Sequence, residues 1–170
     1  MIAKGGRLFN QLLGAIKALV MSGYLVCLYE KIPEENRLAS ILIAREVLVR
    51  VSEIITTLRH VYEESSDHQI KRAIDELEIA HKLLIEIAHN DVSDIRILRT
   101  HGYKEVSYPL LLDDAHHHIH NSITELRKST QLNEKLKEIL RVLEKARRDT
   151  APMELYKKAY QLIKAFSKRD

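Results

Sequence analysis

The sequence is poor in residues that break helices and in residues that form disulfides. Its 170 residues include only five glycines, three prolines, one cysteine and no tryptophan. Cys27 has no partner for a disulfide within the chain, and no Cys/His spacing typical of a zinc finger is present. A lone thiol fits a reducing compartment, so we expect a cytoplasmic protein in which Cys27 is a small buried hydrophobic residue.

The motifs of several common protein classes are also missing. Gly5 and Gly6 do not follow a strand-like segment, so they do not form a glycine-rich phosphate loop, and no nucleophile elbow is present. No uninterrupted apolar run reaches the roughly 18 residues of a membrane span. The apolar N-terminal stretch is interrupted by polar residues such as Lys17, which favours a helix of the fold over about 4–21 rather than a secretory signal. We expect no membrane association and no cofactor.

What the sequence does contain is helical periodicity. Hydrophobic residues make up 45% and charged residues 30%, and apolar positions recur about every 3.6 residues. The pattern predicts helices over about 4–21, 33–64, 67–89, 109–128, 134–148 and 152–167, with no strand-like alternation between them. We therefore predict an all-α fold, a single-domain antiparallel helical bundle of five to seven helices over 1–170. The abundance of Ile, Leu, Glu, Lys and Arg also fits a heat-loving source.

Positive charge is concentrated in a basic C-terminal helical extension, residues 131–170. This part has 11 Lys and Arg against 6 Asp and Glu, although the net charge of the chain is only +3. Tyr156 and Tyr160 alternate there with Lys157 and Lys158, a combination typical of surfaces that stack on and follow single-stranded nucleic acid. The alternative is that the tyrosines face the core and the lysines face water. The buried face predicted for the last helix consists of Leu155, Ala159, Leu162, Ile163 and Phe166.

The stretch "RILRTHGY" contains the densest set of reactive side chains. Arg96, His101 and Tyr103 follow the spacing R-x4-H-x-Y. A histidine can move a proton near neutral pH, and the planar fork of an arginine can hold a phosphate. Together they suit metal-free RNA cleavage, in which a 2′-hydroxyl attacks the neighbouring phosphate. Tyr103 and Arg99 would support them, whereas the alternative is that Arg96 and His101 cap or pair with adjoining helix ends.

This spacing resembles the signature of the HEPN family (higher eukaryotes and prokaryotes nucleotide-binding domains). Members are small all-α bundles in which an arginine is followed after four to six residues by a histidine, often with x-Tyr next. The resemblance implies a ribonuclease or nucleotide-binding protein that works as a homodimer, with Arg96, His101 and Tyr103 in the catalytic positions. The family commonly has Asn or Asp directly after the arginine, where this chain has Ile97.

Histidine and carboxylate clusters allow a third interpretation. His116 and His120 are four residues apart, so they share a helical face and could both bind one Zn²⁺. Glu78-x-x-His81 has the spacing of a di-iron ligand pair, but no second Glu-x-x-His occurs on a later helix. The alternative for these residues is a polar, partly buried helix face.

Three functions follow from the sequence. The first is a HEPN-like helical protein that binds RNA or a nucleotide and cleaves RNA without metal. The second is a non-catalytic assembly or nucleic-acid-binding subunit that uses its basic C-terminal helices and pairs with another protein. The third is a bundle that binds a divalent metal through His116 and His120.

Overall fold

The computed structural model describes residues 34–89, 108–130 and 133–167, together with Gln11. Within these ranges the chain forms helices and no strand: α2 (Glu34–Ser65), α3 (His68–His89), α5 (Tyr108–Arg127), α6 (Glu134–Asp149) and α7 (Pro152–Ser167). Each end lies within a few residues of the predicted one, so the all-helical prediction is confirmed here. None of these helices is long and apolar enough to cross a membrane. Apart from Gln11, the helix predicted over 4–21 lies outside the described residues.

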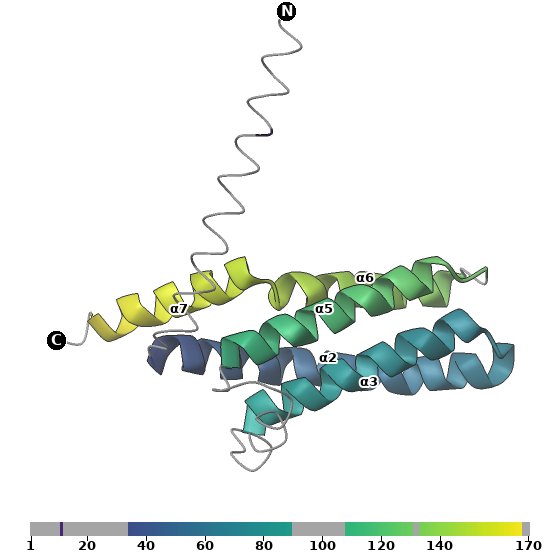
Figure 1. The fold of residues 1–170 in the computed structure, drawn as a ribbon, viewed down its shortest axis with the longest axis horizontal. Helices are drawn as coiled ribbons and strands as arrows, with labels where there is room; N and C mark the ends of the chain where they lie inside the picture. Colours follow the sequence, from purple (N-terminus) through teal and green to yellow (C-terminus); the bar gives the residue numbers. More distant parts are fainter. Residues whose placement is uncertain (1–10, 12–33, 90–107, 131–132, 168–170) are drawn as a thin grey trace, which may run out of the picture.

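The helices form an elongated bundle in which the chain runs back and forth (Figure 1). α2, α3 and α5 are successively antiparallel, and α6 and α7 return along the bundle one after the other. α2, with 32 residues, is the longest helix and packs against α3, α5, α6 and α7. α6 and α7 together therefore occupy the place of one long fourth helix beside α2 and α5.

Asp67 forms the tight turn between α2 and α3 and connects it to α5. Ser66 adopts a positive φ of 54°, and the Asp67 carboxylate accepts a hydrogen bond from the backbone N–H of Gln69 at 2.9 Å, which caps α3. The hydroxyl of Ser129, just after α5, donates to the same carboxylate at 2.6 Å. The hydrogen bond from Ser129 lowers the pKa of Asp67 below its usual value, and the backbone N–H groups that bind the carboxylate lower it further. Burial acts in the opposite direction but is the smaller effect.

The break between α6 and α7 follows from local sequence. Thr150 ends α6, where its buried hydroxyl donates to the carbonyl of Ala146 at 2.9 Å. Pro152 begins α7, at a position where its missing N–H costs nothing. The chain therefore bends between Asp149 and Pro152 instead of continuing as one helix.

The buried apolar side chains form one continuous cluster to which all five described helices contribute. On α7, Leu155 and Ala159 are buried as predicted, and Leu162 packs against the core. The prediction for Ile163 is wrong, because its side chain is 46% exposed. It lies one residue beyond Leu162, about 100° around the helix, and so points away from α2. The side chain of Phe166 lies outside the described residues.

Candidate functional site

The predicted catalytic residues lie in the chain between α3 and α5. Arg96, Arg99, His101 and Tyr103 all fall within 90–107, outside the described residues. The structure describes the helix that ends before this stretch, at His89, and the helix that begins after it, at Tyr108. Their catalytic role stays a prediction.

The two histidines of the predicted metal site contact α6. Nδ1 of His116 lies 2.9 Å from the carbonyl oxygen of Arg147 and 3.1 Å from the hydroxyl of Thr150. Nδ1 of His120 lies 3.2 Å from the guanidinium of the same Arg147, which also pairs with Glu144. One nitrogen of each ring is therefore engaged with the neighbouring helix.

Other histidines and carboxylates of the described helices are also paired individually. His118 lies 2.6 Å from Glu76, and Glu78 of the Glu-x-x-His pair binds Arg59 at 2.6 Å. Within the described ranges, no three His, Cys, Asp or Glu side chains are arranged to hold a metal ion. Metal binding by His116 and His120 thus has no third described ligand.

An exposed face of α7 carries large apolar and aromatic side chains. We call it the α7 face and define it by four residues with exposed fractions of 46–49%: Met153, Tyr156, Tyr160 and Ile163. Their spacing of three and four residues places them on one side of the helix, about 100° around it from Leu155 and Ala159. The two tyrosine rings stack nearly parallel, with centroids 6.3 Å apart and planes 12° apart. The tyrosines therefore do not fill the core.

Lysines flank the α7 face. The ammonium of Lys164 lies 4.7 Å from the ring centroid of Tyr160, in cation–π geometry. Lys157 is exposed and pairs with Glu154 at 3.3 Å, whereas Lys158 is partly exposed on the other side of the helix, two positions from each tyrosine. An exposed ion pair of this kind contributes little, so Lys157 can readily exchange Glu154 for a phosphate. The face combines stacked rings with positive charge.

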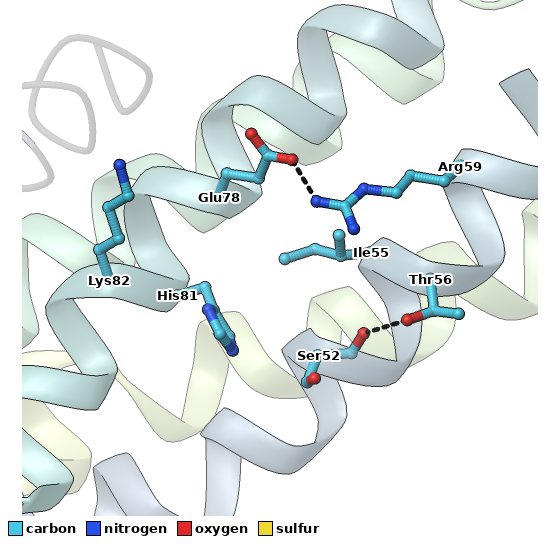
Figure 2. A pocket seen from close by; sticks show the side chains of 7 residues that line it. All are labelled: Ser52, Ile55, Thr56, Arg59, Glu78, His81 and Lys82. Atoms are coloured by element: carbon cyan, nitrogen blue, oxygen red, sulfur yellow. Dashed lines mark hydrogen bonds and ion pairs between the residues drawn. The ribbon is translucent and has the colours of Figure 1, made fainter.

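A pocket of about 320 Å³ opens between α2 and α3 (Figure 2). We call it the α2–α3 pocket. Both helices line it with residues of helical spacing, Ser52, Ile55, Thr56 and Arg59 from α2 and Glu78, His81 and Lys82 from α3. Ile55, only 5% exposed, forms its apolar base, and the remaining lining side chains are polar.

The charges of the α2–α3 pocket are only partly balanced. Arg59 binds Glu78 across the two helices, and Lys82 adds a second positive charge at the rim. Burial and the positive charge of Arg59 lower the pKa of His81, although Glu78 raises it. His81 is therefore mainly neutral at pH 7, with one N–H to donate. In Figure 2 its ring extends from α3 toward Ser52.

The sequence predictions did not identify the α2–α3 pocket. Glu78 and His81 were singled out only as a metal-ligand spacing, and Arg59 lies 19 positions before Glu78. The signal in the sequence is the polar set Ser52, Thr56 and Arg59, which breaks the apolar pattern of α2 on one face. Nothing in that pattern says which face of α3 it meets.

Comparisons of the chain with protein-family models, with curated proteins and with solved structures find no match. The described geometry is therefore the basis for assigning a function.

Proposed function

We propose that this protein binds single-stranded RNA on the α7 face. The observation that carries the proposal is the stacked, half-exposed pair Tyr156 and Tyr160, with the ammonium of Lys164 over one ring. Side chains this large are normally buried in a helix that has a core to face, and α7 does bury Leu155. Exposed aromatic rings can stack on bases, and the neighbouring lysines can bind phosphates.

Energetics favour RNA as the ligand of this face. A base stacked on an exposed aromatic side chain contributes about 1–3 kcal/mol, largely independent of sequence. Lys157 and Lys164 lie on the side of α7 next to the tyrosines and can follow the phosphates.

The test is RNA binding by a chain with both Tyr156→Ala and Tyr160→Ala. Fluorescence anisotropy with a labelled 12-nucleotide single strand should show affinity at least tenfold weaker, because two stacking platforms are lost. The matched control is Met153→Ala with Ile163→Ala, which removes apolar area from the same face without removing a ring. The control should bind RNA within about twofold of the unchanged protein.

Replacing both tyrosines by phenylalanine provides the conservative variant. Phenylalanine keeps the ring, so RNA affinity should stay close to that of the unchanged protein. Unchanged affinity in the double alanine variant would refute stacking on the α7 face. Equal losses in the Met153/Ile163 control would show that the affinity depends on the apolar area of the face rather than on stacking by the rings, and would also contradict the proposal.

A second activity is proposed for the stretch before α5, on the strength of its spacing and its HEPN-like pattern. Arg96 would hold the scissile phosphate, His101 would act as acid or base, and Tyr103 and Arg99 would support them. The His101→Ala chain should lose RNA cleavage in EDTA while keeping the RNA affinity and melting temperature of the unchanged protein. Cleavage that persists in this variant, or requires a divalent metal, contradicts the assignment.

A further inference from the structure

We propose that the α2–α3 pocket binds a phosphate group, as inorganic phosphate or as the terminal phosphate of a nucleotide. The proposal goes beyond RNA binding on the α7 face and does not depend on it. It rests on the side chains that α2 and α3 bring to one pocket of about 320 Å³. That volume lies at the small end of ligand sites in proteins.

Hydrogen-bond donors predominate in the pocket. Arg59 engages Glu78 through one terminal nitrogen, Nη2, which leaves other N–H groups of its fork for a second acceptor. His81 donates one N–H, and Lys82 has three ammonium donors on a flexible stem at the rim. Ser52 lines the pocket from α2, as Arg59 does, and adds a hydroxyl. Such a set fits the oxygens of a phosphate better than it fits a cation.

The charge balance favours an anion. Two cations, Arg59 and Lys82, are among the lining residues against one carboxylate, Glu78, and in Figure 2 the Lys82 side chain extends away from the pocket, so its flexible stem must turn to reach a ligand. Another hollow, of about 260 Å³ between α2 and α6, provides a contrast. It is lined by two cations and two carboxylates, so it has no net charge to attract an anion: Arg50, Lys135, Glu53 and Glu138.

Glu78 determines the direction in which a substitution should change phosphate affinity. Its carboxylate occupies part of Arg59 at 2.6 Å and repels any anion that enters the pocket. A phosphate must therefore share or displace Glu78. Removing the Glu78 charge should strengthen phosphate binding, an effect that misfolding cannot imitate.

The test is an NMR titration of the full chain with sodium phosphate and, separately, with adenosine 5′-monophosphate at constant ionic strength. Signals of Ser52 and His81 should shift on saturation, and the pKa of His81 should rise because the bound dianion favours its protonated form. Glu78→Gln should bind about five- to tenfold more tightly, and Arg59→Gln at least tenfold more weakly.

Asp75→Asn is the matched control for Glu78→Gln. Asp75 is on the same helix, in an exposed ion pair with Lys71 at 2.8 Å, outside the pocket. Asp75→Asn removes the same charge as Glu78→Gln and should change phosphate affinity less than twofold. If Asp75→Asn and Glu78→Gln have equal effects, the response is to overall charge and the pocket proposal is wrong. Absence of shifts at Ser52 and His81 with both ligands also overturns it.

The two ligands separate the sources of the phosphate. Tighter binding of the nucleotide than of inorganic phosphate assigns a role to the sugar or base, whereas equal affinities assign the site to the phosphate alone. The same titration in the Tyr156→Ala, Tyr160→Ala chain should be unchanged. This result separates failure of the pocket proposal from failure of RNA binding on the α7 face.

Discussion

At the residue scale, His116 is a histidine whose surroundings disfavour its charged form. Burial lowers the pKa of His116, the hydrogen bond to the Arg147 carbonyl opposes that effect, and neighbouring His117 and Arg147 contribute to the lowering. Because Nδ1 lies 2.9 Å from a carbonyl oxygen, which can only accept a hydrogen bond, the neutral ring carries its proton on Nδ1.

The lowered pKa predicts how stability depends on pH. Above a pH of about 6.5, the ordinary value for histidine, both the folded and the unfolded chain hold the ring neutral. Below it, the unfolded chain binds the proton first, so the free energy of unfolding falls as pH drops toward the folded pKa. His116→Asn keeps a donor near the position of Nδ1 but cannot titrate. Urea unfolding at several pH values should therefore show a smaller loss of stability between pH 6.5 and 5 in this variant.

His81 supplies the comparison, since its pKa is lowered by burial and by Arg59. His81→Asn should remove a separate part of the same pH dependence, and the two substitutions together should remove more than either alone. An unchanged pH profile in His116→Asn would contradict the interpretation of this residue.

The residue scale is also where sequence is least informative. The spacing of His116 and His120 correctly predicts that they share a helical face. It cannot predict that both rings meet Arg147, about 30 positions later, because that contact depends on how α5 and α6 pack. For the same reason, the Arg59–Glu78 pair had no signal in local sequence.

At the scale of the helix, the N-cap of α6 can be tested directly. Asn133 precedes α6, and its side-chain oxygen accepts a hydrogen bond from the N–H of Leu136 at 3.0 Å. Asn133→Ala should lower the free energy of unfolding by about 1 kcal/mol because this N–H loses its partner. Asn133→Asp keeps the acceptor and should retain stability within a few tenths of a kcal/mol, measured by urea unfolding. Equal losses in both variants would show that the cap contributes through something other than this bond.

Helix ends were predictable because caps and prolines are local signals. Pro152 and Thr150 mark the change from α6 to α7, and Asp67 caps α3, all by contacts within a few residues. The orientation of α7 was less predictable because both of its sides carry large apolar residues. Leu155 and Leu162 pack inward, whereas Ile163 is exposed, and only the position of α2 decides between the two sides.

At the scale of the whole molecule, the described helices carry two candidate binding surfaces. The α2–α3 pocket belongs to the first hairpin of the described residues, and the α7 face belongs to their last helix. The fold class could be predicted from the sequence because helical periodicity extends over many residues, so a wrong assignment at one position does not change it. The two sites could not be predicted in the same way, because each depends on a few side chains whose relative positions are set by packing.

The uneven charge of the molecule makes a final prediction about RNA binding. Residues 131–170 carry an excess of five positive charges, so the logarithm of the affinity for single strands should fall linearly with the logarithm of salt concentration. Each phosphate contact contributes about 0.7 to the slope for a single strand, so Lys157→Gln with Lys164→Gln should reduce its magnitude by about 1.4. The control, Lys71→Gln with Arg72→Gln on α3, removes the same net charge and should leave the slope unchanged. Equal reductions in both would mean that RNA responds to the overall field of the protein rather than to contacts on α7.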